Sequence, residues 1–229
     1  MKKNIKEKYF NDKKQHLSIP LKEIVPEYYS NNLFIKLLFE KRQNIALMYI
    51  SKINPYILLD IGCGDGSLIR KIKKKNKMIK TFGIDINPNV IKLNSIFKEK
   101  IFSKQDLNKL SFKRNSFDTI TCLDVLEHIK DLNSALSKIK SVIKENGFLI
   151  TSEPTENLLY KSLRFIYKGT FSQESGPTAG AHYWNANQID KFIRLHGFKR
   201  IHNKKIPISF PFLTLFHVNL YKKIKKVNK

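Results

Sequence analysis

The residues best suited to chemistry form the short stretch Asp60-Ile61-Gly62-Cys63-Gly64-Asp65-Gly66, between the apolar run YILLDI and the helix-like SLIRKIKKK. Glycines at this spacing let the backbone turn tightly and approach a ligand closely. Doubly wound sheets bind nucleotides at such a turn, outside the carboxyl end of the first strand. The helix that follows offers free N–H groups to a carboxylate or a phosphate. The stretch therefore predicts a nucleotide-type cofactor site, and the alternative is a strand–turn–helix without a ligand.

The acidic residues around this turn indicate which kind of nucleotide would bind. A dinucleotide site shows GxGxxG, whereas this loop is GxGxG with Asp60 two residues before its first glycine. Asp60 and Asp65 would repel a pyrophosphate but attract an ammonium and a sulfonium. Asp85, about twenty residues further on at the end of TFGIDI, is placed to accept both ribose hydroxyls of an adenosine. These residues favour a zwitterionic, cationic cofactor over NAD.

A second polar group, Asp124-Val125-Leu126-Glu127-His128, follows the apolar run FDTITCL. The end of that run would lie on the same edge of a parallel sheet as the glycine loop. His128 is the candidate general base, because an imidazole titrates near neutrality and could take the proton of an acceptor hydroxyl. The alternative is a histidine that caps or orients the loop.

The elements that must position these residues alternate between strand and helix. An apolar helical period over Asn31–Lys52 precedes the first strand, and helix-start or helix-stop signals mark the later helices. The alternation predicts an α/β fold, a doubly wound Rossmann-like seven-stranded sheet, mostly parallel with an antiparallel final strand and with helices on both faces. The predicted strands are Tyr56–Ile61, TFGIDI, Ile101-Phe102, Phe117–Leu123, Gly147–Ser152, FKRIHNKKIPI and FLTLFHVNLYKKI, and the later helices are NPNVIKLNSIFKEK, Leu132–Lys144 and Asn187–His196.

The domain organisation follows from the same pattern. Residues 1–30 are lysine-rich and contain Pro20 and Pro26, so we expect a flexible basic arm. Residues 31–229 form a single domain, in which 155–184 is an insert rich in aromatics and glycine, without a clear helical period. We expect this insert to cover the acceptor as a substrate cap. Its aromatic residues would either stack on the acceptor or form the core of the cap; they are Tyr160, Phe165, Tyr167, Tyr183 and Trp184.

These motifs together resemble a known family. LLDIGCGDGSLI, FGIDINPNVI, QDLNKLSFKRNSFDTITCLDVLEHI and KENGFLITSEP are similar, in order and spacing, to the successive motifs of class I S-adenosylmethionine-dependent methyltransferases. The resemblance is strongest to the small-molecule branch that includes the ubiquinone and menaquinone biosynthesis methyltransferases. It runs from about Asn31 to Pro154 and returns in HYWNANQIDKFIRLHGF. It implies S-adenosylmethionine as the cofactor and a small-molecule methyl acceptor, such as a quinone, a lipid-like metabolite or a sugar, methylated on oxygen or carbon.

The resemblance also implies roles for individual residues. Gly62, Cys63, Gly64 and Gly66 would wrap the methionine part of the cofactor, with Asp60 near its amino group and Leu123 at the same end. Asp85 would hold the ribose, Ile86 and Leu107 would contact the adenine, and Asp106 would accept from the adenine amine. Asp106 has a plainer interpretation as a cap or turn residue, and Ile86 and Leu107 as ordinary apolar packing.

We expect no metal, but one alternative set of ligands remains open. Asp124, Glu127 and His128 resemble the ExxEH cluster that binds a divalent ion in some quinone-ring O-methyltransferases and in small-RNA 2′-O-methyltransferases. His182 would be the later histidine of that set. The first position is Asp where those families have Glu, which shortens its reach.

The formal net charge of +24 has two interpretations. It could attract nucleic acid or an anionic membrane, but lysine is spread along the chain and arginine is scarce, which favours a compositional origin. The acid-free region Lys191–Lys229 includes FPFLTLFHVNLYKKIKKVNK, which is either a weak membrane anchor or, as we prefer, a terminal strand. An RNA methyltransferase and a non-catalytic cofactor-binding protein are the alternative functions.

The predicted location is the cytoplasm. The two cysteines, Cys63 and Cys122, form no CxxC pair and suit a reducing compartment. We find neither an apolar signal-peptide core after the basic N-terminus nor an apolar run of membrane-spanning length.

Overall fold

The computed structural model describes residues 32–90, 101–168, 181–210 and 212–224. The predicted basic arm, most of the helix predicted after Asn87-Pro88, residues 169–180 of the insert and the last five residues lie outside these ranges. Within them, the backbone enters that helix at Pro88, the position at which a proline is best tolerated.

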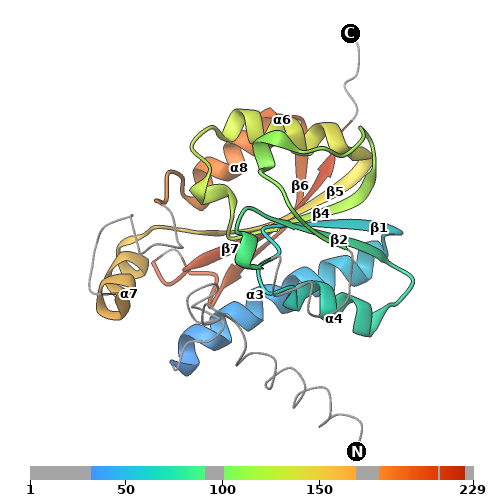
Figure 1. Cartoon of the computed structure of the whole chain (residues 1–229). Coiled ribbons are helices and arrows are strands. Elements are labelled where there is room, and N and C mark those ends of the chain that lie inside the picture. Colours follow the sequence, from blue (N-terminus) through green and yellow to red (C-terminus); the bar gives the residue numbers. More distant parts are fainter. Residues whose placement is uncertain (1–31, 91–100, 169–180, 211, 225–229) are drawn as a thin grey trace, which may run out of the picture.

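The strands form one seven-stranded sheet in the order β3-β2-β1-β4-β5-β7-β6 (Figure 1). The strands β1 to β5 pair in parallel, and β7 runs antiparallel to both of its neighbours. This confirms the predicted doubly wound sheet and its antiparallel final strand. The order reverses beside β1, so the carboxyl ends of β1 and β4 form the crevice in which such sheets bind ligands. The strands are β1 Ile57–Ile61, β2 Lys80–Asp85, β3 Phe102–Lys104, β4 Phe117–Leu123, β5 Ile143–Pro154, β6 Phe198–Ile206 and β7 Phe216–Lys223.

Helices cover both faces of the sheet (Figure 1). The helices α6 Leu132–Val142 and α8 Ala186–Leu195 lie on one face, and α3 Leu33–Ile53 and α4 Ser67–Lys75 lie on the other. Each pair buries its apolar side against the sheet, which gives two hydrophobic clusters. Burial of these apolar faces, rather than helix propensity alone, fixes the helices in place.

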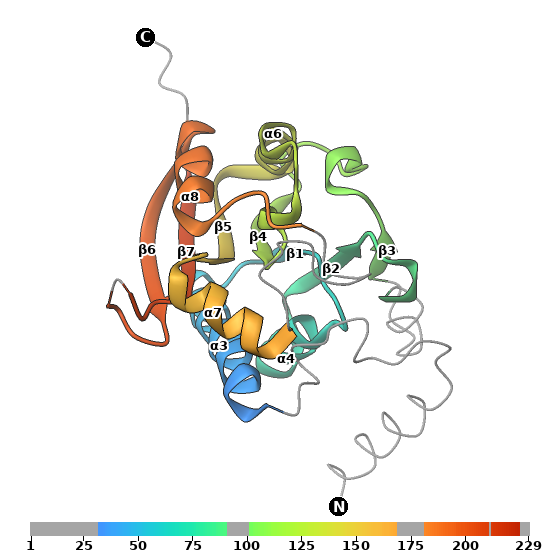
Figure 2. The same ribbon diagram turned by 90° about the vertical axis from the view of Figure 1, so that its left-hand side faces the viewer.

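A helix that the sequence did not indicate, α7 Leu158–Lys168, occupies the insert. It begins after Asn157, whose side-chain oxygen accepts from the Tyr160 N–H at 2.8 Å. Its Leu159, Tyr160 and Leu163 pack against the apolar cluster on the α3 side of the sheet, and Tyr160, Leu163 and Ile166 line a cavity, so its apolar residues recur at helical spacing. In the view toward the carboxyl ends of the parallel strands, α7 lies in front of the sheet (Figure 2).

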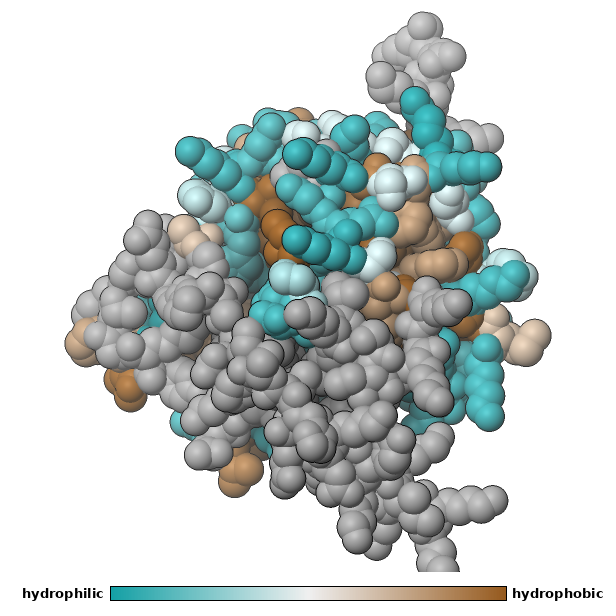
Figure 3. Space-filling view, viewed as in Figure 1, coloured by the Kyte–Doolittle hydropathy of each residue, from teal (hydrophilic) through white to brown (hydrophobic). Residues whose placement is uncertain are grey.

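The C-terminal strands account for much of the acid-free basic region. β7 is buried between β5 and β6, as expected for a terminal strand rather than a free anchor. Lys199, Lys204 and Lys205 are exposed on β6, the edge strand, where charges discourage pairing with another chain. Hydrophilic side chains also dominate the upper half of the face in Figure 3, on the α6 side of the sheet. No described helix combines the length and apolarity needed to cross a bilayer.

Candidate functional site

The glycine loop turns as the sequence predicts. Gly62, Gly64 and Gly66 have φ of 68°, 50° and 74°, the left-handed region that glycine adopts without strain. The Gly62 and Cys63 N–H groups donate to the Ile84 carbonyl at 2.8 and 3.0 Å, which ties the loop to the end of β2. A Cβ on Gly62 would lie 2.2 Å from the Val125 side chain. The loop therefore needs glycine both for its backbone conformation and for its close approach to the residues after β4.

The two acids of the loop have different surroundings. Asp60 is 3% exposed and accepts a hydrogen bond from the Thr121 hydroxyl at 2.6 Å. Burial raises the pKa of Asp60 to about 7, with smaller contributions of the same sign from Asp85 and Asp65, while the Thr121 bond opposes the shift. Asp65 instead accepts from the Ser67 N–H at 2.9 Å and pairs with Arg70 at 3.3 Å, so its carboxylate stabilises the start of α4.

Asp85 lies directly beside the loop. Its two carboxylate oxygens accept from the Gly64 N–H at 3.1 Å and from the Asn87 N–H at 2.9 Å. Burial raises the pKa of Asp85, and these backbone hydrogen bonds act in the opposite direction. The end of β2 is thereby fixed against the glycine loop of β1.

A cavity of about 680 Å³ opens at this edge of the sheet. It is lined by Asp60, Gly62, Cys63, Gly64, Asp85, Ile86, Asp106, Leu107 and Leu123, that is, by all the residues predicted to bind the cofactor except Gly66. The Gly66 N–H donates to the Cys63 carbonyl at 2.9 Å, so Gly66 closes the turn without lining the cavity. Ile86 is 66% exposed at the rim, and Leu107 is buried in the core as well as lining the cavity.

The same cavity extends to the residues that follow β4. His128 ends the short 3-10 helix η2 Leu126–His128, and its Nδ1 lies 3.3 Å from the Ala181 carbonyl. Its ring meets that of His182 edge to face, with centroids 4.7 Å apart. Donor atoms of Glu127, His128 and His182 all lie within 4.8 Å of one another. Residues far apart in sequence therefore converge on one part of the cavity wall.

Asp124 does not join this cluster, although the sequence grouped it there. It adopts φ of 58° and pairs with Arg42 of α3 at 2.5 Å. Glu127 is 2% exposed, and its Oε2 has no hydrogen-bond partner among the described residues. Burial raises the pKa of Glu127, with a further contribution from Asp124. The four-residue metal set is thus reduced to three side chains that could share one ion.

Arg42 is one of the cavity residues that sequence reasoning missed. It is 2% exposed, lines the cavity, and has its guanidinium 3.5 Å from the Phe39 ring centroid and 4.0 Å from that of Phe216. Its Nε and Nη2 have no hydrogen-bond partner among the described residues. The signal was present in the helical period, because Arg42 follows Leu38 and precedes Ala46 by four residues and so lies on the buried face.

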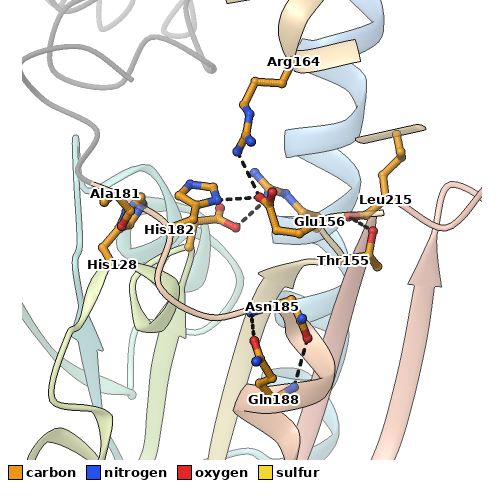
Figure 4. A network of polar contacts seen from close by, with 11 residues as sticks. His128, Thr155, Glu156, Arg164, Ala181, His182, Asn185, Gln188 and Leu215 are labelled. Atoms are coloured by element: carbon orange, nitrogen blue, oxygen red, sulfur yellow. Dashed lines mark hydrogen bonds and ion pairs between the residues drawn. The ribbon is translucent and has the colours of Figure 1, made fainter. Parts of the chain in front are cut away.

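A network of polar contacts joins residues of the insert near the part of the cavity where His182 faces His128 (Figure 4). Glu156 accepts from His182 Nδ1 at 2.6 Å and from Arg164 of α7 at 3.1 Å. Arg164 and His182 both line the cavity. The network therefore connects the helix that covers the cavity with the histidine that faces His128.

Of the five aromatic residues proposed for the cap, Tyr160 lines the cavity. Trp184 donates from Nε1 to the Ile129 carbonyl at 2.8 Å and packs edge to face on Phe192, which makes it core. Phe165 and Tyr183 are partly exposed outside the lining, and the side chain of Tyr167 is outside the described residues. The cavity has other aromatic walls, Phe34, Phe39 and Phe216.

Comparison with known proteins gives both curated relatives and solved structures. An uncharacterized protein of Methanocaldococcus jannaschii is 32% identical over 130 residues, which cover 57% of this chain and 54% of that protein. A ubiquinone biosynthesis O-methyltransferase of Rhodopseudomonas palustris is 26% identical over 164 residues, covering 67% of this chain and 61% of the relative. The chain thus spans less than two thirds of the length of these curated relatives.

The solved structure of magnesium protoporphyrin IX methyltransferase from Synechocystis, with bound SAH, has the same fold. It superposes with a TM-score of 0.61 at 21% identity and covers 85% of this chain and 89% of that chain. A family model described as a methyltransferase domain matches residues 29–203. Because that match covers more than half of the chain, including the glycine loop and strands β1 to β5, the chain belongs to the methyltransferase domain family.

Proposed function

We propose that this chain transfers the methyl group of S-adenosylmethionine to a small-molecule acceptor, by O- or C-methylation. The main support for the proposal is that the glycine loop and His128 line one continuous cavity. The SAH in the Synechocystis methyltransferase and the name of the Rhodopseudomonas palustris relative support the cofactor and the reaction class.

The walls of the cavity suit the parts of this cofactor one by one. Asp60 offers a carboxylate to the ammonium group, and Asp85 offers two oxygens at the place of the ribose hydroxyls. Asp106 and Leu107 are available to the adenine. We assign the methionine carboxylate to Arg42, whose buried guanidinium also pairs with Asp124. Asp124 precedes Val125, the residue whose side chain lies beside Gly62 of the glycine loop.

The acceptor would occupy the other end of the cavity. Phe39, Tyr160, Leu163 and Phe216 make its walls largely apolar, so the acceptor has an aromatic or aliphatic body. The bound sulfonium supplies an electrophilic methyl group, and the chain holds the acceptor in line with it and excludes water. For a hydroxyl acceptor, His128 takes the proton as the oxygen–methyl bond forms and the sulfur–methyl bond breaks.

A methyltransfer assay tests the proposal directly. Purified protein is incubated with S-adenosylmethionine and a panel of phenolic, quinol, sugar and prenylated acceptors, and SAH release is followed. We expect turnover with at least one acceptor that has an apolar body. Tight cofactor binding with no turnover on any acceptor class would instead indicate a non-catalytic cofactor-binding protein.

The convergence of Glu127, His128 and His182 favours a second candidate mechanism, metal-assisted methylation. The oxygen and nitrogen donors fit one divalent ion, which would polarise an acceptor hydroxyl when bound. Asp124 does not fit, since Arg42 holds it. Full activity after dialysis against EDTA supports the metal-free mechanism, whereas loss of activity restored by a divalent salt supports the alternative.

An RNA acceptor and weak association with an anionic membrane are the partner predictions that draw on the net charge. The apolar walls of the acceptor end favour a small molecule over a nucleic acid chain. Oligonucleotide binding with a steep salt dependence would favour the RNA methyltransferase, and flotation with anionic liposomes would support the membrane association.

A further inference from the structure

We propose that Glu156 is a positioning residue, which orients His182 so that its Nε2 faces the acceptor beside His128. Arg164 holds Glu156 in place in turn. The inference rests on the proposed function for its catalytic consequence, but the arrangement of the side chains can be tested without it. Glu156 does not line the cavity and so acts through His182 rather than on the acceptor.

The contacts hold Glu156 from two sides. Its Oε1 lies 2.6 Å from His182 Nδ1 and 3.1 Å from Arg164 Nη1, and the three side chains are only 7%, 10% and 6% exposed. In Figure 4, Arg164 reaches down from its helix and His182 points across from the segment that also carries Ala181. A carboxylate shielded from water and shared by two donors has little freedom to rotate away.

The backbone of Glu156 indicates that its side chain is required there. Its φ of 53° lies in the left-handed region, which suits glycine or asparagine better than glutamate. Residues held in that region persist when their surroundings fix them, and such positions cluster at functional sites. The contacts with His182 and Arg164 are the restraints that the described structure provides.

The consequence for His182 is a defined proton position. A carboxylate that accepts from Nδ1 keeps the proton on that nitrogen, as in other histidines oriented by a carboxylate. Nε2 is then the nitrogen left for the cavity that His182 lines, and its lone pair can accept a hydrogen bond from the acceptor. The edge-to-face contact with His128, at 4.7 Å between centroids, places the two imidazoles around the same acceptor group.

Arg164 connects this geometry to the helix that covers the acceptor. It is a residue of α7, whereas His182 follows residues 169–180 in the sequence. The Tyr183 N–H also donates to the Glu127 carbonyl at 2.7 Å, which fixes the histidine segment to η2. The position of His182 is therefore set by α7 on one side and by the His128 helix on the other.

A double-mutant cycle on the methyltransfer reaction tests the catalytic part. We expect Glu156→Gln to lower kcat by about 10- to 100-fold, the usual loss for a residue that orients a functional histidine, and Glu156→Ala to lower it further, because Gln keeps an oxygen that can accept from Nδ1. Cofactor affinity should stay unchanged. In a His182→Ala background neither substitution should change kcat again.

The matched control is Glu145→Gln, since Glu145 also pairs with a buried cation, Lys223, at 2.7 Å but lies on the other side of the molecule from the cavity. It should leave kcat unchanged. Additive losses in the His182→Ala background, or an equal loss of cofactor affinity, would show that Glu156 has a general structural role and would overturn the proposal.

Imidazole ¹⁵N NMR tests the arrangement without any turnover. Wild-type His182 should show a single neutral tautomer with the proton on Nδ1. The double variant Glu156→Gln/Arg164→Met should show mixed tautomers or a different tautomer. Arg164 is replaced as well because a buried arginine without its carboxylate would destabilise the fold. The same His182 spectrum in both proteins, or an Nε2 proton in the wild type, would contradict the proposal. If no acceptor is methylated but the spectra change as expected, the proposed function fails while the positioning of His182 stands.

Discussion

The two ends of the cavity are built in different ways. At the cofactor end the walls come from the glycine loop, Asp85, Asp106 and Leu123, each at or just after the carboxyl end of a parallel strand. At the acceptor end they come from α3, η2, α7 and the segment around His182, which are far apart in sequence. Sheet topology alone brings the first set together, whereas the second depends on how the helices and the insert pack.

The two ends also differ in how they hold charge. At the cofactor end, Asp85 accepts from the Gly64 and Asn87 N–H groups, and Asp60 accepts from the Thr121 hydroxyl. The acceptor end instead holds Glu156 in a buried ion pair with Arg164. Buried pairs are costly to break, because one charge is then left without a partner. We therefore expect substitutions at the two ends to separate cofactor affinity from turnover.

The largest expected effect is on turnover, at the acceptor end. His128→Gln should lower kcat by about 10²- to 10⁴-fold, the usual contribution of a general base, with unchanged cofactor affinity. The control is His202→Gln on β6, where the ring stacks on Tyr49 far from the cavity lining. Steady-state kinetics with an identified hydroxyl acceptor checks the result, and full activity of His128→Gln would remove the base from the mechanism.

A glycine comparison should affect affinity at the cofactor end. Gly62→Ala places a Cβ 2.2 Å from Val125, and Gly197→Ala places one 2.9 Å from the flexible end of Lys140, both at positive φ. Both variants carry the left-handed strain of about 1–2 kcal/mol. Only Gly62→Ala adds overpacking of about 1–3 kcal/mol beside the cofactor, or about 5- to 150-fold in affinity. Calorimetry that finds equal affinity in the two variants would contradict this role of the loop.

Asp85→Asn should weaken cofactor binding by about 10-fold, because one charged acceptor is lost while an amide oxygen remains. The control is Asp118→Asn, which removes a carboxylate paired with Lys144 at 2.7 Å near the opposite end of β4. Calorimetric titration of both variants measures the difference. A loss in Asp118→Asn as large as that in Asp85→Asn would mean that the effect comes from the sheet and not from the ribose.

A separate prediction concerns the pH dependence of stability at Asp60. Its pKa is about 7 in the folded chain against 3.8 unfolded, mainly because of burial. Between these values the folded state keeps a proton that the unfolded state has lost, so the free energy of unfolding falls as pH rises toward 7.

Urea unfolding of the ligand-free protein across this pH range measures the slope. Asp60→Asn should reduce it by the contribution of one proton, because Glu127 and Asp85, whose pKa values burial also raises, contribute slopes of the same sign. Glu153, whose pKa burial raises to about 8, should keep a slope of the same sign at higher pH in both proteins. An identical slope in the wild type and in Asp60→Asn would show that Asp60 ionises normally in the fold.

The sequence predicted the fold around the glycine loop well because its signals are local. The strand, glycine turn and helix around Gly62 are contiguous, and β4 has the predicted bounds, Phe117–Leu123. The parallel order then places Asp85 beside the loop. Gly66 was the exception, since a glycine can be needed for the turn without facing the ligand.

The acceptor end was predicted only in part, for physical reasons. His128 and His182 were paired by a motif, but the same motif grouped Asp124 with them, and a buried arginine from α3 holds that carboxylate elsewhere. The helix α7 was missed because it occupies only part of the insert, and the glycine-containing sequence after it has no helical period. Glu156 gave no signal, since its role depends on contacts with residues 8 and 26 positions away.

Calorimetric titration of the purified protein with S-adenosylmethionine, SAH and NAD tests the central claim most directly. We predict saturable one-site binding of S-adenosylmethionine and SAH and no binding of NAD, because the Asp60 carboxyl lines the cavity beside the glycine loop and would repel a pyrophosphate there. Failure to bind S-adenosylmethionine, or binding of NAD with equal affinity, would contradict it.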